Sequence, residues 1–258
     1  MFINNFDPVA FKILTFDVRW YSLAYIIGIL LGWFLCKKIF IKNTNFSQKF
    51  DDYITYLILG IIIGGRLGYV IFYNFEHYIN NLLDIFKIWE GGMSFHGALI
   101  GIIFGTYLFA KVKNISTFFL LDIIACVSPI GIFLGRIANF INGELVGKIT
   151  TVSWGVIFPA VDTLARHPSQ LYEAILEGLV LFFLLNKIIF RKVYKLGFCS
   201  SLFLICYGVF RIISEFFREP DIQLGYLFNL FSMGTILSFF MILAGLLMLN
   251  ILRRKNEN

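Results

Sequence analysis

The sequence predicts an all-α integral membrane protein, a seven-transmembrane-helix bundle with a small outer (periplasmic) head region. Of the 258 residues, 59% are hydrophobic and only 15% are charged, whereas about 25% of the residues in a typical soluble domain are charged. The apolar residues also gather in seven runs, and a helix needs about 20 such residues to cross a bilayer. Much of the chain is therefore expected to be surrounded by lipid.

Each apolar run is expected to form one membrane-spanning helix. The first run begins near Trp20. It is preceded by Asp7 and Asp17 rather than by a basic n-region, and no A-x-A site follows it, so it is expected to be a retained helix and not a cleaved signal peptide. The third run is short. The fourth contains Asp122 and Pro129, and a proline is acceptable there because neighbouring helices can bond the carbonyl that it frees. The expected spans are residues 20–40, 53–73, 95–109, 118–135, 171–190, 198–217 and 230–252.

The distribution of Lys and Arg orients these spans. Thirteen basic residues follow the first, third and fifth spans or lie in the C-terminal tail, and six lie on the opposite side. Because cytoplasmic loops are richer in Lys and Arg, we expect the N-terminus outside and the C-terminus in the cytoplasm. The chain would then be a single polytopic membrane domain, residues 1–258, with an outer N-terminal arm at 1–19 and an outer head region at 136–168.

Composition and motifs exclude several classes of function. The net charge of +6 is explained by basic cytoplasmic loops, and no polar segment interleaves basic and aromatic residues, so no nucleic-acid partner is expected. The four cysteines lie in or beside apolar runs without a CxxC. That pattern is typical of small buried hydrophobes, so neither a metal site nor a disulfide framework is expected.

Glycines recur at the spacing of helix contacts. Small residues let helix backbones approach closely in membranes, so packing is the expected role, and lining a lipid cleft is the alternative. The glycines are Gly28/Gly32, Gly60/Gly64/Gly68, Gly97/Gly101/Gly105 and Gly131/Gly135.

Among the ionisable residues within or at the ends of the spans, five form a conspicuous set. A charge inside the bilayer costs from about 3 kcal/mol upward, which makes such residues candidates for function. They are Arg66, His96, Arg136, Arg211 and Glu215. All five fall in the outer half of their spans under the expected topology, so we predict one polar cavity near the outer leaflet.

The sixth span places several of its polar residues on one helix face. Tyr207, Arg211, Glu215 and Arg218 are spaced i, i+4, i+8 and i+11. Arg211 and Glu215 can pair directly, and for Glu215 a structural ion pair is the favoured interpretation. For Arg211 a functional role is favoured, because one paired carboxylate would leave guanidinium donors for a phosphate.

Two further groups of polar residues have alternative interpretations. Arg136 and Asn139 are followed by Asn142 and Glu144, a set that could bind a polar head group or could cap the helix and form a turn. His96 could be a general base that exchanges a proton near neutral pH, or a hydrogen-bonded interior residue.

Six sequence blocks resemble the prolipoprotein diacylglyceryl transferase family and follow the order of that family along nearly the whole chain. The signature block is GRIANFINGELVG, which runs from Gly135 through Gly147. The other blocks are WYSLAY, GGRLGYVIFYN, GGMSFHGALIG, RHPSQLYEA and YGVFRIISEFFREPD. The resemblance implies a seven-span enzyme of the bacterial cytoplasmic (inner) membrane with its active site near the outer leaflet, in agreement with the topology above.

The resemblance also implies the reaction. The lipobox cysteine thiol of a preprolipoprotein signal peptide would attack the glyceryl carbon of phosphatidylglycerol, a membrane lipid. A thioether would form and glycerol 1-phosphate would leave, without a metal or organic cofactor.

Residue roles follow from the resemblance and the chemistry together. Arg136 and Arg211 would neutralise the leaving phosphate with a fork that Lys cannot copy, and His96 would take the thiol proton or only provide an essential hydrogen bond. Tyr21 could donate a hydrogen bond to lipid. The remaining head-group or network candidates are Arg66, Asn139, Glu144, Gly147 and Glu215.

Two other classes of function also place charged residues inside a membrane protein. A phospholipid or small-anion transporter would also place arginines in a cavity, but it should show an internal repeat with paired broken helices. An intramembrane protease needs a Ser–His pair or paired aspartates, and Asp122 stands alone in its span.

Overall fold

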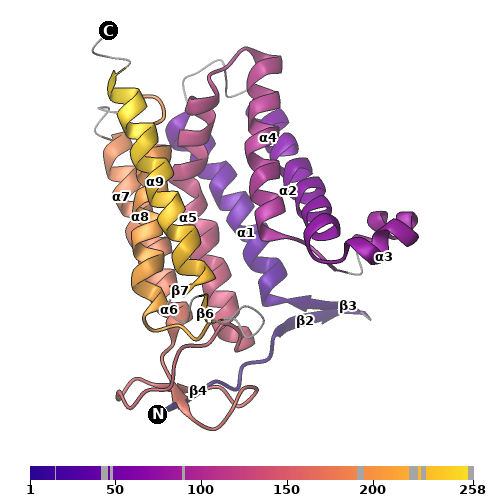
Figure 1. Ribbon diagram of the computed structural model, residues 1–258, viewed down its shortest axis with the longest axis vertical. Coiled ribbons are helices and arrows are strands. Elements are labelled where there is room, and N and C mark those ends of the chain that lie inside the picture. Colours follow the sequence, from indigo (N-terminus) through magenta and orange to yellow (C-terminus); the bar gives the residue numbers. More distant parts are fainter. Residues whose placement is uncertain are drawn as a thin grey trace. The chain divides into compact units, whose positions relative to one another are not determined.

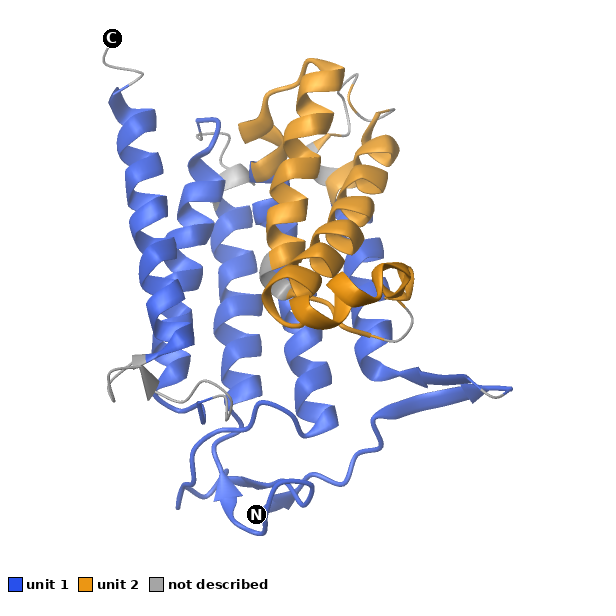
Figure 2. Ribbon diagram, turned by 45° about the vertical axis from the view of Figure 1, so that its right-hand side comes forward, with its two compact units in different colours: residues 1–35, 122–258 blue, residues 36–121 orange. Residues whose placement is uncertain are grey.

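The computed structural model describes residues 1–14, 16–41, 46, 49–88, 91–190, 195–220, 226–227 and 231–254; the side chains of 39–40, 95–96, 188–190, 226–227 and 231 lie outside this description. The chain forms two compact units (Figure 2). Unit 1 comprises residues 1–35 and 122–258, and unit 2 comprises residues 36–121.

Unit 1 is a set of helices with a small strand region at one end. Its helices are α1 (Trp20–Leu35), most of α5 (Thr117–Asn142), α6 (Ser169–Glu173), the π-helical segment η4 (Ala174–Val180), α7 (Leu181–Phe190), α8 (Phe198–Glu215) and α9 (Met233–Arg254). The N-terminus lies at the strand end of this unit and the C-terminus at the other end (Figure 1).

The strands of unit 1 are short. β1 (Phe2–Ile3) pairs in parallel with β4 (Val156–Ile157), which pairs antiparallel with β5 (Ala165–Arg166). β2 (Val9–Ile13) and β3 (Phe16–Arg19) form an antiparallel ribbon that leads into α1. β6 (Tyr226–Leu227) pairs with β7 (Phe231–Ser232) just before α9. The expected N-terminal arm is therefore built into a sheet with the segment that follows α5.

Unit 2 contains the π-helical segment η1 (Cys36–Phe40), α2 (Phe50–Phe72), α3 (Phe75–Asn80), the 3-10 turn η2 (Leu82–Phe86) and α4 (Phe95–Lys113). Its two long helices pack through glycines. A methyl group on Gly68 would lie 2.7 Å from Cα of Gly97, and one on Gly105 would lie 2.8 Å from the carbonyl oxygen of Tyr56. The packing interpretation of these glycines is confirmed for α2 and α4.

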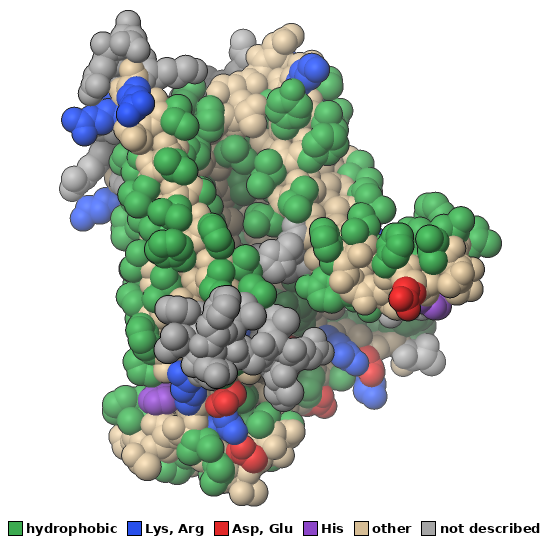
Figure 3. Space-filling model, viewed as in Figure 1, with side chains coloured by type: hydrophobic (Ala, Val, Ile, Leu, Met, Phe, Trp, Pro, Cys, Tyr) green, Lys and Arg blue, Asp and Glu red, His purple; other side chains and the backbone are tan. Residues whose placement is uncertain are grey.

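A helix lies within each of the seven predicted spans. Within the described ranges, six helices are long and apolar enough to cross a membrane, and α4 is not one of the six. Hydrophobic side chains cover the visible helix surfaces (Figure 3). On α9, for example, Phe240 and Leu247 are 62% and 63% exposed. The chain is therefore a multi-pass membrane protein, whereas the count of seven spans stays a prediction.

One boundary differs from the prediction and matters for the site. The fourth span was expected to end at Gly135, but α5 continues to Asn142. The residues after Gly135 keep an apolar helical face, with Ala138 buried, and the helix ends only where Gly143 takes a positive φ of 68°. Arg136 and Asn139 therefore lie on a helix and not in a loop.

Asp122 has a structural role in unit 1. Its carboxylate accepts hydrogen bonds from the backbone N–H of Gly197 at 2.6 Å and from the backbone N–H and hydroxyl of Ser200 at 2.7 and 2.6 Å. These groups belong to the first turn of α8, whose amide donors have no partner within the helix. The lone aspartate of the fourth span thus caps a neighbouring helix.

Candidate active site

Six charged side chains of unit 1 form one connected cluster, which we call the arginine–glutamate network. It lies near the strand end of the helices. Arg136 comes from α5, Glu173 from α6, and Glu177 from η4 one turn later. Arg211 and Glu215 come from α8, and Arg218 follows that helix. Among the described residues, the network contains three arginines and three glutamates, so these charges balance.

Glu173 joins the three arginines. Its Oε2 lies 2.9 Å from Nε of Arg136, and its Oε1 lies 3.3 Å from Nη1 of Arg218. Arg211 donates to the same Oε1 through Nη1. The Glu173 side chain is 1% exposed. A buried charge of this kind is tolerated only when it is paired and hydrogen-bonded, so Glu173 fixes the positions of three guanidinium groups at once.

The other two glutamates hold the arginines from different sides. Glu177 accepts from Nη2 of Arg136 at 3.2 Å, and its second oxygen lies 3.8 Å from Arg211. Glu215 lies 2.5 Å from Nη2 of Arg211 and accepts a hydrogen bond from the Ser232 hydroxyl at 2.8 Å. The predicted i, i+4 pair of Arg211 and Glu215 is confirmed, but Arg211 also contacts two more carboxylates.

A close helix contact keeps two members of the network together. A methyl group on Gly178, the residue after Glu177, would lie 2.9 Å from Cα of Phe133 on α5. Phe133 precedes Arg136 by slightly less than one helical turn. The absence of a side chain at 178 therefore lets η4 approach α5 closely enough for Glu177 to reach Arg136.

Glu173 and Glu177 were missing from the sequence-based candidates. They lie in the fifth expected span, within YEAILEG. The rule that identified Arg136 and Arg211, an ionisable residue inside an apolar run, applies equally to these two glutamates. Their i, i+4 spacing also predicts a shared helix face.

Asn139, Asn142 and Glu144 contact one another at the end of α5. Glu144 accepts from Nδ2 of Asn142 at 3.0 Å and from Nδ2 of Asn139 at 3.4 Å, and its backbone N–H donates to the carbonyl of Asn139 at 3.0 Å. These bonds terminate the helix, as the capping interpretation expected. They also hold two amides and a carboxylate together at the C-terminal end of the helix.

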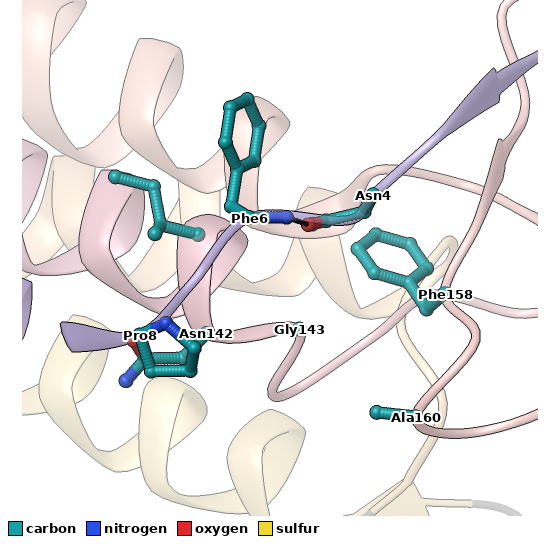
Figure 4. A pocket seen from close by; sticks show the side chains of 8 residues that line it. Asn4, Phe6, Pro8, Asn142, Gly143, Phe158 and Ala160 are labelled. Carbon is teal, nitrogen blue, oxygen red and sulfur yellow. Dashed lines mark hydrogen bonds between the residues drawn. The ribbon is translucent and has the colours of Figure 1, made fainter.

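A small cavity of about 130 Å³ lies beside this turn (Figure 4). Asn142 and Gly143 line it from the end of α5, and Asn4 and Phe6 line it from the N-terminal arm. Oδ1 of Asn142 is buried and has no hydrogen-bond partner among the described residues. The predicted contact of this region with a polar head group stays a prediction.

Gly147 brings two backbone segments together. Its N–H donates to the carbonyl of His167 at 3.1 Å, and the next amide, of Lys148, donates to the carbonyl of Phe217 at 2.8 Å. A methyl group at 147 would lie 2.7 Å from the carbonyl oxygen of Phe217. The structure thus gives Gly147 a packing role, and its predicted contact with substrate remains untested.

Tyr21 lies on α1 in the same unit as the network. The α1 and α5 backbones approach closely at Gly28, where a methyl group would lie 3.2 Å from Cα of Gly131. Tyr21 precedes Gly28 by seven residues and Arg136 follows Gly131 by five. At 1.5 Å per residue, the two side chains start about 10 and 8 Å from the crossing, toward the strand end.

Arg66 and His96 belong to unit 2. Arg66 donates to five backbone carbonyls between residues 84 and 92, at 2.5 to 3.1 Å, and stacks over the ring of Tyr78. His96 lies in the first turn of α4, and its side chain is outside the described residues. The prediction that these two residues share one cavity with Arg136 and Arg211 stays a prediction.

The apolar helices and the buried network define a class of protein: a multi-pass membrane protein with an arginine-rich site suited to a phosphate-bearing lipid. A family model described as prolipoprotein diacylglyceryl transferase matches residues 8–251. The chain belongs to this family.

Curated relatives carry the same description. A phosphatidylglycerol–prolipoprotein diacylglyceryl transferase of Rickettsia typhi is 53% identical over 249 residues, covering 95% of this chain and 96% of the relative. Relatives of the same name from Rickettsia felis and Rickettsia bellii are 52% and 51% identical over 249 and 250 residues. They cover 95% of this chain and 96% and 95% of the relatives' own lengths.

Proposed function

We propose that the chain transfers the sn-1,2-diacylglyceryl group of phosphatidylglycerol to the lipobox cysteine thiol of a preprolipoprotein. Family membership supports the transferase activity and both substrates. The structural observation that carries the proposal is the arginine–glutamate network, because it holds three guanidinium groups near the end of membrane-spanning helices, where a lipid phosphate can reach them.

The transfer requires charge stabilisation on the phosphate. The cysteine sulfur attacks the glyceryl carbon and a C–S bond forms. The C–O bond to phosphate breaks, and its electron pair stays on the oxygen of the departing glycerol 1-phosphate. Donors that are already fixed in place stabilise such developing charge without reorganising. Arg136 suits this role because, among the described residues, its Nη1 has no hydrogen-bond partner and its side chain is 16% exposed.

The glutamates prepare the arginines for this step. Glu173 and Glu177 are almost fully buried and neutralise guanidinium groups that would otherwise be expensive to keep away from water. A bound phosphate can then compete with the longest contact, the 3.8 Å pair of Arg211 and Glu177, without leaving Arg211 unpaired. Arg136 and Arg211 would contact the phosphate, and Glu173 would position them.

His96 is our candidate for the proton transfer. Only the thiolate is a good nucleophile, and an imidazole can accept the thiol proton near neutral pH. An essential hydrogen-bonding role for His96 is the alternative. Tyr21, Asn139, Glu144 and Gly147 are proposed to shape the head-group site on the side of unit 1.

We also propose the topology expected from the basic residues: a single polytopic domain of seven spans in the bacterial cytoplasmic membrane, the N-terminus outside, the C-terminus in the cytoplasm, and the site near the outer leaflet. Lys and Arg asymmetry supports this orientation. Reporter fusions at the C-terminus and within 148–162 test it. A C-terminal reporter active only outside would contradict it.

The activity is tested with purified protein, phosphatidylglycerol and a peptide that carries the lipobox cysteine. We expect the peptide mass to increase by one diacylglyceryl group, and glycerol 1-phosphate to appear in equal amount. A peptide with Ser in place of the cysteine is the matched control. Movement of lipid across vesicles without any adduct would instead support a transporter.

A further inference from the structure

Helices α8 and α9 of unit 1 run side by side in close contact (Figure 1). A methyl group on Gly208 of α8 would lie 2.8 Å from the carbonyl oxygen of Ser238 on α9. One on Gly245 of α9 would lie 2.8 Å from the carbonyl oxygen of Ser201 on α8. Small residues let helix backbones approach closely in this way. The first turn of α9 consequently lies beside Glu215, the last residue of α8.

The carboxylate of Glu215 occupies space that a side chain at the start of α9 would fill. A methyl group on Gly234, the second residue of α9, would collide with Oε1 of Glu215 and lie 3.2 Å from Nη2 of Arg211. The first amide groups of a helix have no partners within the helix and carry partial positive charge, which favours a nearby carboxylate. Gly234 therefore leaves room for the ion pair of Arg211 and Glu215 at the positive end of α9.

The Ser232 hydroxyl links this carboxylate to α9. Ser232 is buried directly before the helix and accepts from the backbone N–H of Thr235 at 3.1 Å, which is an N-cap bond. Its hydroxyl also lies 2.8 Å from Oε2 of Glu215 and 3.0 Å from the hydroxyl of Thr235. A hydroxyl has one proton to donate and two lone pairs that accept. Because a carboxylate can only accept and an amide can only donate, the Ser232 proton points to Glu215 and the Thr235 hydroxyl donates to Ser232.

The two oxygens of Glu215 thus have different partners among the described residues. Oε1 lies 2.5 Å from Nη2 of Arg211, and Oε2 makes its hydrogen bond to Ser232. An arginine and a carboxylate frequently pair through two parallel hydrogen bonds, with both oxygens on one edge of the guanidinium. Since Ser232 holds Oε2, Glu215 pairs with Arg211 through Oε1, and guanidinium donors are left for another anion.

We propose that Ser232 is a positioning residue for the transfer: it keeps Glu215 from closing onto Arg211 with both oxygens, and so keeps Arg211 able to receive the lipid phosphate. This inference rests on the proposed function, in which Arg211 contacts that phosphate. The Glu215 side chain is only 8% exposed, and buried carboxylate oxygens need hydrogen-bond partners. Without the Ser232 hydroxyl, Oε2 would be free to take a second donor from Arg211. Glu215 would then compete with the phosphate, and lipid binding would weaken more than the later chemical step.

The test measures the rate of adduct formation against the mole fraction of phosphatidylglycerol in mixed micelles, with the lipobox peptide at saturation. Ser232→Ala should raise the KM for lipid about tenfold, the usual effect of losing a hydrogen bond to a charged group, and change kcat much less. Ser232→Thr keeps a hydroxyl and should restore the KM. Ser232→Gly lacks the hydroxyl, but Gly is a better N-cap than Ala. It should therefore unfold at a higher temperature than Ser232→Ala and raise the KM equally.

A double-mutant cycle shows whether Ser232 acts through Glu215. In a Glu215→Gln background the carboxylate that Ser232 restrains is gone, so adding Ser232→Ala should raise the KM by less than about twofold further. For any variant too slow to assay, binding of phosphatidylglycerol without peptide replaces the KM. Ser201→Ala is the matched control, because Ser201 is fully buried near the other end of α8 and its hydroxyl donates to the carbonyl of Gly197 on its own helix. It should leave the KM unchanged.

Three results would overturn the positioning role of Ser232. They are a wild-type KM in Ser232→Ala, an equal rise in KM with and without Glu215→Gln, and a loss in Ser232→Gly that is smaller than in Ser232→Ala in proportion to its higher unfolding temperature. The last result would reduce Ser232 to a helix cap. Absence of any adduct from the wild-type protein would instead contradict the proposed function, so the two failures are distinguishable.

Discussion

Arg66 of unit 2 and Arg136 of unit 1 illustrate two uses of an arginine in a membrane-spanning helix. Backbone carbonyls occupy every nitrogen of Arg66, so its guanidinium holds residues 84–87 and 91–92 in place. Arg136 pairs with two carboxylates and keeps one Nη group without a described partner. An arginine saturated by carbonyls is a structural clamp, whereas one balanced by glutamates is charge-neutral and still able to receive an anion.

The largest effect is expected at His96. If His96 is the base, His96→Asn should keep the fold and slow the chemical step by about 10²–10⁴, the usual contribution of a positioned base. The deficit should shrink at high pH, where more of the substrate thiol is already ionised. Rate against pH, with lipid binding measured separately, checks this. A constant deficit together with lost lipid binding would make His96 a structural residue and leave Glu144 or a water as the base.

Lys substitutions test whether the two arginines have different roles. Arg136→Lys and Arg211→Lys should insert normally but lose about 10²–10³ in rate, because a point charge cannot replace a planar fork on a phosphate. Arg66→Lys should instead show its loss mainly in thermal stability, with the rate per folded molecule less affected. Near-normal activity of both network variants would remove support for the phosphate clamp.

Glu173 is expected to affect folding as well as rate. Removing one partner of a buried ion pair costs about 3–5 kcal/mol, and Glu173→Gln leaves three arginines with one carboxylate fewer at 1% exposure. We expect a lower unfolding temperature and a raised KM for phosphatidylglycerol. Glu219→Gln is the control, since Glu219 pairs with Arg166 at 49% exposure. Equal effects of the two variants would contradict the role of Glu173.

The smallest effect is expected in the strand region. Hydrogen bonds from Arg166 lower the pKa of Asp162 below its ordinary value. Because the folded pKa is depressed, the stabilisation is present above the ordinary value of about 3.9 and is lost as the pH falls through the folded pKa. Asp162→Asn should therefore lower the unfolding midpoint, followed by Trp154 fluorescence, at pH 7 but no longer at the lowest pH. A difference that does not depend on pH would contradict this.

The sequence predicted the helices and named four of the six network residues, for a common physical reason. Apolar runs identify spans directly, and a charged residue within or next to a run is conspicuous, so Arg136, Arg211, Glu215 and Arg218 could be found. The five partners of Arg66 could not be found, because every residue carries a backbone carbonyl and only the fold selects five of them. Ser232, which donates to Glu215, lies in β7, which the sequence does not connect with α8.

The fifth span shows a different kind of omission. Glu173 closely follows the polar RHPSQ segment, and charged residues are common at the start of a helix. Glu177 lies inside the apolar run, so the rule that an ionisable residue in such a run is a candidate applies to it. The residues were therefore predictable in type and position. The contact of these glutamates with Arg136 on α5 was not predictable, because it depends on the close helix contact at Gly178.

That contact at Gly178 has a consequence for the path by which lipid can enter the protein. A methyl group on Gly178 would lie 2.6 Å from Cβ and 2.9 Å from Cα of Phe133, so η4 and α5 are in close contact here and leave no opening between them. Under the proposed function, lipid is expected to reach Arg136 from a flank other than the one between α5 and η4. Gly178→Ala would push η4 and α5 apart by about the size of one methyl group. We expect this variant to show altered selectivity for lipid size and an unchanged requirement for the peptide.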